Sequence, residues 1–144
     1  MVRSGRISTV LLLVIVALAA LVGVIFFFRG ENYMQSATQF MDALSRGDTA
    51  KLSELSHIDG NDKAQIKEKW DKTFRFGKHF KFIWTVKSGR ETGADSAVVT
   101  LTYWRSPDLG GYDEKFEVPL IKKDGKWLVE VRGLSRQMFP ALPR

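Results

Sequence analysis

An uninterrupted apolar run near the N-terminus constrains this chain more than any other feature of its sequence. Residues 10–28 read VLLLVIVALAALVGVIFFF, and none of them is charged. A helix rises about 1.5 Å per residue, so this run approaches the ~30 Å thickness of the hydrocarbon core of a bilayer. The sequence therefore predicts a cytoplasmic N-terminus over 1–9, a transmembrane helix over 10–28 and the lipid bilayer as a partner.

Basic residues at the two ends of the run predict its orientation. Arg3 and Arg6 precede it, whereas Arg29 follows it and the next basic residue is Arg46. Because basic residues stay on the cytoplasmic side, we expect a single-pass protein of the bacterial inner membrane with its C-terminal domain outside the cytoplasm. A cleaved signal peptide is the alternative, since Ala17-Leu18-Ala19 fits a small-x-small cleavage site. The apolar segment LVGVIFFF follows that site, so a cleaved chain would begin close to an exposed apolar segment, which disfavours cleavage.

Composition excludes several kinds of site. The chain has no cysteine, which excludes disulfides, thiolate metal sites and a cysteine nucleophile. Its net charge of +6 includes three arginines beside the apolar run, so we expect no nucleic-acid partner. Basic residues are dense over 63–90, which indicates either a solvated face or contacts with lipid headgroups or an acidic partner. The candidates for such contacts are Lys67, Lys69, Lys72, Arg75 and Lys78.

Apolar spacing predicts three helices after the run. Residues 33–46 have helical periodicity and end before Gly47, a plausible C-terminal stop. Asp48 or Thr49 can cap a second, short helix that carries two leucines. Asn61 or Asp62 can cap a third, in which Ile66, Trp70 and Phe74 are spaced four apart and share one stripe.

The pattern then changes to the period of two that is typical of strands. We expect strands over 79–87, 97–104, 115–121 and 127–132. A turn region with Gly89 would fill 88–95, a hairpin turn would lie at 123–126, and an edge or bulge is expected at Pro119. The expected fold class is α+β, with about three helices packed on a curved, four-stranded antiparallel sheet. The domain would span 33–132, and a C-terminal tail, 133–144, would pack loosely or extend towards a partner.

Two segments resemble the nuclear transport factor 2-like (cystatin-like cone) superfamily. ATQFMDALSRGDTAKLSELS, over 37–56, is similar to the helix, Gly-Asp turn and short helix that open its members. FEVPLIKKDGKWLVEV, over 116–131, is similar to their final hairpin. The likeness is greatest to small bacterial membrane-tethered members of unknown role. It implies a cone-shaped domain, but the superfamily holds both enzymes and assembly modules, so function has to be argued from the site.

Strand parity predicts which side chains face inward. A pocket inside the cone would be lined by Phe80, Phe82, Trp84, Tyr103, Phe116 and Trp127. No Asp or Glu is expected among the inward residues, and isomerase chemistry needs a carboxylate base in an apolar pocket. His57 and His79 lack metal-ligand spacing, and no nucleophile elbow or phosphate loop is present. We therefore expect no catalytic residues, no metal, no cofactor and no enzymatic activity.

The outer face of the sheet is unusually apolar for a solvated surface. Its expected members are Ile83, Thr85, Val98, Thr100, Thr102, Trp104, Ile121 and Leu128. A contiguous patch of this kind often marks an interface, and the superfamily resemblance implies dimerisation there, although the tail or a loop could instead cover it.

The leading hypothesis is a non-catalytic, membrane-anchored interaction module, either an accessory subunit of a larger membrane complex or a homodimer. A binding module for a small apolar or lipid ligand in the cone is the first alternative, because aromatic residues dominate the expected interior. An isomerase or dehydratase is the second alternative.

Overall fold

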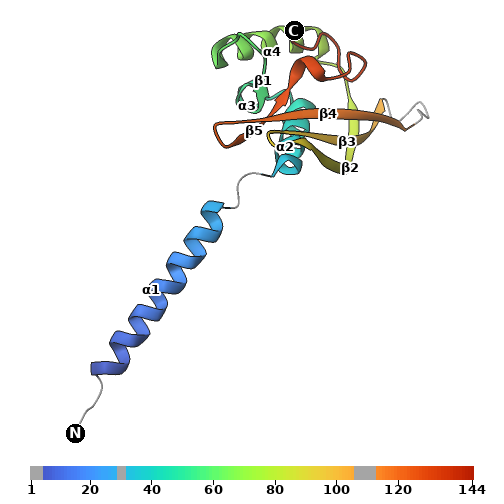
Figure 1. The fold of residues 1–144 in the computed structure, drawn as a ribbon. Helices are drawn as coiled ribbons and strands as arrows, with labels where there is room; N and C mark the ends of the chain where they lie inside the picture. The colour runs from blue at the N-terminus through green and yellow to red at the C-terminus, as the bar shows by residue number, and fades with distance from the viewer. Residues whose placement is uncertain (1–4, 29–31, 106–112) are drawn as a thin grey trace. The chain divides into compact units, whose positions relative to one another are not determined.

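The chain consists of two compact units, 1–30 and 31–144. The computed structural model describes residues 5–28, 32–105 and 113–144, and within the first range it describes the side chains of 11–22. Figure 1 shows the order of the helices and strands along the chain.

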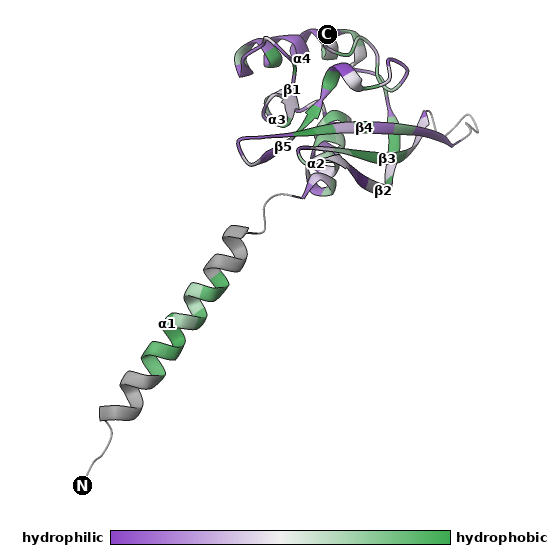
Figure 2. Cartoon of the chain, in the orientation of Figure 1, coloured by the Kyte–Doolittle hydropathy of each residue, from purple (hydrophilic) through white to green (hydrophobic). Residues whose placement is uncertain are grey.

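The first unit contains one helix, α1 (Gly5–Phe28). Its described middle is strongly hydrophobic (Figure 2), with apolar side chains such as Leu11 and Leu18 more than half exposed. No helix within the described residues is long and apolar enough to cross a membrane. The predicted transmembrane helix over 10–28 is therefore wrong, and so is the single-pass inner-membrane location that depended on it.

The second unit begins with three helices, as predicted. They are α2 (Tyr33–Arg46), α3 (Thr49–Leu55) and α4 (Lys63–Gly77). Capping explains their bounds: Gly47 ends α2 in the left-handed conformation, with φ of 71°, and the Asp48 carboxylate accepts from the Lys51 N–H at the start of α3. Asp62 and Gln65 form a capping box at the start of α4.

The sheet has five strands rather than four, and it is mixed rather than purely antiparallel. The strands are β1 (Ser56–His57), β2 (Phe82–Gly93), β3 (Ser96–Arg105), β4 (Glu114–Lys123) and β5 (Lys126–Glu130), in the spatial order β1-β5-β4-β3-β2. β1 pairs with β5 in parallel, through Ser56 with Val129 and His57 with Glu130. The predicted four-stranded antiparallel sheet is therefore wrong. The sequence shows no sign of β1 because its two residues are too few to produce an alternating pattern, and because its partner strand lies about 70 residues further on.

Strand β2 is longer than its alternation indicated. The predicted turn over 88–95 is mostly strand, because a register shift between Val86 and Ser88 absorbs the break in the pattern. Gly89 then passes so close to α2 that a Cβ atom there would lie 2.4 Å from the Met34 Sδ and 2.7 Å from the Tyr33 ring. The glycine that suggested a turn is needed for helix-on-sheet packing. Pro119 lies one residue beyond the last pairing of β4 with β5, Leu120 with Val129, so its missing N–H interrupts no ladder there.

The C-terminal tail is part of the core, contrary to the expectation that it packs loosely. Met138 is fully buried and Phe139 is 2% exposed. The Phe139 ring lies 5.2 Å from the rings of both Phe74 on α4 and Phe80 before β2. The Thr73 hydroxyl donates to the Ala141 carbonyl oxygen at 2.6 Å. After the helix η2 (Val131–Gly133), the tail thus runs over the inner side of the sheet beside α4.

We predict that Phe139→Ala lowers the free energy of unfolding by about 3–5 kcal/mol, the usual cost of truncating a buried phenylalanine. Urea denaturation followed by tryptophan fluorescence measures the change. Arg136→Ala, in the same tail but exposed, is the control and should change the free energy by less than about 0.5 kcal/mol. Equal, small effects of both substitutions would show that the tail contributes nothing to stability.

Candidate functional site

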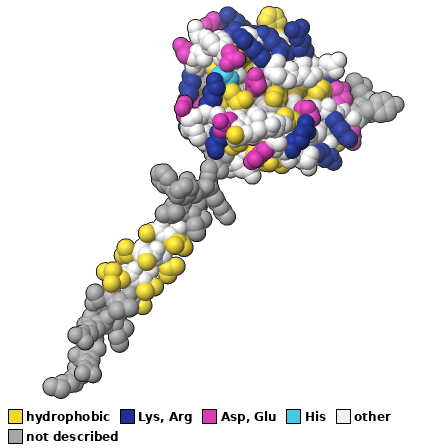
Figure 3. Space-filling view, in the orientation of Figure 1, with side chains coloured by type: hydrophobic (Ala, Val, Ile, Leu, Met, Phe, Trp, Pro, Cys, Tyr) yellow, Lys and Arg dark blue, Asp and Glu magenta, His cyan; other side chains and the backbone are white. Residues whose placement is uncertain are grey.

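The outer face of the sheet is built from residues that the strand register places opposite one another. Ile83 pairs with Trp104, and Thr85 with Thr102, between β2 and β3. Ile121 pairs with Leu128 between β4 and β5. Directly opposed residues point to the same side of a sheet, so these pairs form one surface. Figure 3 shows hydrophobic side chains gathered in the middle of one face of the domain, with charged side chains around them.

The predicted members of this face differ in accessibility. Ile83 is 50% exposed and Thr85 is exposed. Val98, Thr100, Trp104, Ile121 and Leu128 are half-buried, while Thr102 is only 3% exposed between its neighbours on β2 and β4. The structure therefore brings all eight residues onto one surface, but Thr102 offers little area for a contact. An ion pair lies across β3 on this same face, with Arg90 Nη1 3.4 Å from Glu117 Oε1, because Arg90 is opposite Val98 and Glu117 is opposite Thr100.

The tail does not cover this face as the alternative prediction required. Gly133 touches Pro119, where an added Cβ would lie 2.6 Å from the proline ring. Beyond that corner, the buried residues Met138 and Phe139 contact inward-facing residues such as Tyr103 and Phe82. The outer surface from Ile83 to Leu128 thus stays accessible within the described part of the domain.

The six residues predicted to line a pocket lie together on the inner face, but they are packed as a core. The rings of Phe82 and Tyr103 stack at 4.8 Å, and Phe116 meets Tyr103 edge-on at 5.2 Å. Trp127 packs edge-on against Tyr33 of α2 at 5.6 Å. Phe80 and Trp84 are half-buried at the margin of this cluster. Phe139 packs edge-on against Phe80 and Phe82 on this same inner face.

Tyr103 has a carboxylate neighbour that the parity argument missed. Glu114, opposite Tyr103 in the register of β3 and β4, shares its inward face. The expectation that no Asp or Glu is inward was therefore wrong. It missed Glu114 because the strand was predicted to begin at residue 115, one position later. Its side chain is 41% exposed, however, and lies 3.3 Å from Arg105 Nη2. The Tyr103 hydroxyl donates to the Met138 carbonyl oxygen, and burial raises the pKa of Tyr103. This arrangement holds a neutral phenol in a structural hydrogen bond.

The five basic residues predicted to contact headgroups or an acidic partner lie on α4 and at its C-terminal end. Lys67 and Lys72 form ion pairs of 3.0 Å with Asp71 and Glu68, one turn away. Lys69 donates to the Arg144 carbonyl oxygen at 2.7 Å. Arg75 and Lys78 are exposed. Part of this charge is thus neutralised locally, and a role in binding stays a prediction.

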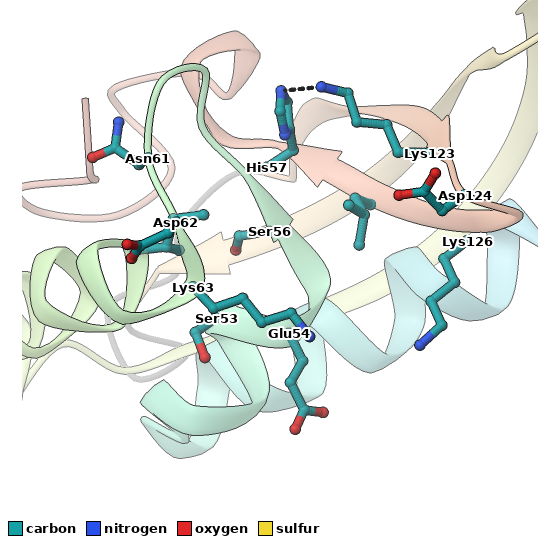
Figure 4. Close-up of a pocket in the computed structure, with 12 residues that line it drawn as sticks. Ser53, Glu54, Ser56, His57, Asn61, Asp62, Lys63, Lys123, Asp124 and Lys126 are labelled. Atoms are coloured by element: carbon teal, nitrogen blue, oxygen red, sulfur yellow. Dashed lines mark hydrogen bonds between the residues drawn. The ribbon is translucent and has the colours of Figure 1, made fainter.

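Sequence reasoning missed a cleft at the end of the sheet where β1 joins. It has a volume of about 610 Å³ and lies between the α3–β1–α4 segment and the β4–β5 hairpin (Figure 4). Ser56, His57, Lys63, Lys123 and Lys126 are among the residues that line it. The sequence carried no signal for this site, because the parallel pairing of β1 with β5 is what brings residues 53–66 close to residues 123–128.

His57 organises one wall of the cleft. Its Nε2 atom lies 2.8 Å from Asp59 Oδ1 and 3.0 Å from Lys123 Nζ. One ring nitrogen cannot donate to the carboxylate and accept from the ammonium group at the same time, so only one of these contacts is a hydrogen bond in a given protonation state. The hydrogen bond and charge of His57 hold the pKa of Asp59 below its usual value, with smaller contributions from Lys123 and Arg132.

Comparison with known proteins bears on the fold. No family model and no curated protein matches the sequence. Among solved structures, a Thiobacillus denitrificans protein assigned as a calcium/calmodulin-dependent protein kinase type II association domain matches with a TM-score of 0.50 and 10% identity, over 67% of this chain and 87% of that one. A Nostoc punctiforme domain of unknown function with a cystatin-like fold matches with a TM-score of 0.48 and 15% identity, over 66% and 68%. An NTF-2 like protein of unknown function from Shewanella oneidensis matches with a TM-score of 0.47 and 14% identity, over 67% and 89%.

The domain is similar in fold to the Thiobacillus protein. The two segments that carry the superfamily resemblance fold as it implied: 37–56 runs through α2, the turn at Gly47 and α3, and 116–131 contains the β4–β5 hairpin. An identity of 10% says nothing of shared activity, so the role of this domain rests on its own surfaces.

We predict that Tyr103 ionises at higher pH than an ordinary tyrosine, in an alkaline titration followed by tyrosinate absorbance. Because its folded-state pKa is raised above the value of about 10 in the unfolded chain, the stabilisation is complete below pH 10 and is lost as the pH rises further. Tyr103→Phe should remove the late step from the titration. A late step that survives this substitution would assign the shift to another residue.

We also predict that His57→Ala raises the pKa of Asp59 towards the ordinary carboxyl value, as measured by carbon-detected NMR titration of the side chain. Lys123→Ala is the matched control and should raise it less, because the His57 contact is the larger cause. A larger rise in the lysine variant would reverse the roles assigned to the two neighbours.

Proposed function

We propose that this protein is a non-catalytic interaction module, which associates through the outer face of its sheet with a second copy of itself. The observation that carries the proposal is the accessible surface around Ile83 and Trp104, on a sheet whose opposite face is fully used in the core. Aliphatic and aromatic side chains that stay accessible on a folded domain gain free energy when a partner removes them from water.

The composition of the face supports a protein partner. Ile83, Val98, Ile121 and Leu128 supply hydrocarbon, and Trp104 supplies an aromatic anchor of the type that often dominates interfaces. The exposed pair of Arg90 and Glu117 provides both signs of charge on the same face. Two copies related by a twofold axis can exchange such contacts symmetrically.

The packing of the inner face argues against the two alternatives. An apolar ligand would have to displace Phe139 and Met138, which are buried against the aromatic cluster. An isomerase mechanism would have to release the Tyr103 hydroxyl from the Met138 carbonyl and Glu114 from Arg105 before either could contact a substrate. The Thiobacillus protein of similar fold is assigned as an association domain, which is compatible with the same use of the fold here.

Replacement of Ile83 by lysine tests the proposal. A charge in the middle of the face must be desolvated on association, so we predict that Ile83→Lys weakens self-association at least tenfold. Sedimentation equilibrium of the full chain measures it, in a mild detergent that covers the exposed apolar side chains of α1. Ala64→Lys, which adds the same charge at an exposed position of α4, is the control and should leave the association constant within about twofold.

Two results would contradict the proposal. One is a wild-type chain that stays monomeric over the whole concentration range. The other is an association constant that Ala64→Lys lowers as much as Ile83→Lys does, because the loss would then follow total charge rather than the sheet face.

A further inference from the structure

We propose that the cleft between the α3–β1–α4 segment and the β4–β5 hairpin binds a small organic anion, one that carries a phosphate or carboxylate group. This goes beyond association through the sheet face. Its volume of about 610 Å³ is within the usual range for small-molecule sites, and it is a different space from the filled interior of the cone.

The first argument is that, in what the structure describes of the chain, the lysines lining the cleft form no ion pairs, whereas two of its three carboxylates already have partners. Lys63, Lys123 and Lys126 line the cleft, and within the described residues none of them forms an ion pair with a carboxylate. Three carboxylates also line it. Glu54 lies 3.5 Å from Lys51 Nζ, and Asp62 accepts from the Gln65 N–H as the cap of α4. Only Asp124, in the hairpin turn, has no such partner in the described part of the chain.

The second argument is a buried hydroxyl with a proton to donate. Ser56 is 4% exposed, yet it lines the cleft. Its Oγ accepts from Nε1 of the fully buried Trp70 at 3.0 Å, which fixes the position of the oxygen. Among the described residues no acceptor takes the hydroxyl proton of Ser56, so this proton is free for an oxygen atom of a ligand. A preordered donor of this kind lowers the entropic cost of binding.

The third argument is the chemistry of the remaining walls. Ile66 and Leu128 provide apolar contact surface, and the Asn61 side chain adds an amide. The Lys123 ammonium group reaches across the cleft rim to His57 Nε2, as the dashed line in Figure 4 shows. Lysine binds phosphate and carboxylate oxygens as a mobile point charge, so Lys123 can exchange the imidazole for an anion without a change in the backbone. Together these groups suit an organic anion that has an apolar part.

Isothermal titration calorimetry on the full chain tests the proposal, with pyrophosphate and citrate as separate probes at low salt. We expect saturable binding of at least one probe at a single site. Binding of pyrophosphate alone would assign a phosphate ligand, and binding of citrate alone would assign a carboxylate. The double substitution Lys123→Ala with Lys126→Ala should weaken binding at least tenfold.

The matched control is Lys67→Ala with Lys72→Ala, which removes the same charge from ion-paired positions of α4 outside the cleft. It should change the dissociation constant by less than about threefold. The proposal is overturned if neither probe saturates, or if the control weakens binding as much as the cleft variant. Ile83→Lys leaves the cleft lining intact, so a failed association experiment and a failed binding experiment are independent results.

Discussion

The burial of the C-terminal tail against the inner face of the sheet decides how the rest of this domain can be used. Met138 and Phe139 complete a layer of rings that includes Phe82 and Tyr103, and the Tyr103 hydroxyl is held by the tail itself. Because protein interiors are close-packed, a side chain placed there excludes a ligand from the same space. The concave side, which a cone could use as a pocket, is here a source of stability.

The two proposed binding surfaces differ in chemistry. The outer sheet face offers hydrocarbon and an indole ring, and the Arg90–Glu117 pair adds both signs of charge. The cleft beside β1 offers ammonium groups and a fixed hydroxyl, with apolar contact limited to part of its wall. They meet at Leu128, which belongs to both. This difference in chemistry is the reason for proposing a second protein copy at the first surface and a small anion at the second.

The sequence-based predictions were wrong where contacts between distant segments, rather than the local residue pattern, decide the structure. Glu114 lies one residue before the strand predicted over 115–121, but the pairing of β4 with β3 extends the strand to include it and turns it inward opposite Tyr103. Gly89 was assigned to a turn, but a β-bulge lets β2 continue past it under α2. The tail was expected to be loose because it lacks periodicity, yet single large side chains such as Phe139 need no periodicity to be buried. The apolar run at the N-terminus is helical, but among the described residues no helix has the length and apolar character to cross a membrane.

The sequence by itself determined the three helices of the domain, the parity of its main strands and the division into an aromatic inner face and a mixed outer face. These follow from local rules: caps at Asp48 and Asp62, the stop at Gly47, and apolar residues that recur every two or four positions. Only the tertiary structure decided that the tail fills the cone and that a cleft opens beside β1. Both depend on contacts between segments far apart in the chain, such as Ser56 with Val129 and Thr73 with Ala141, and the spacing of neighbouring residues carries no information about such contacts.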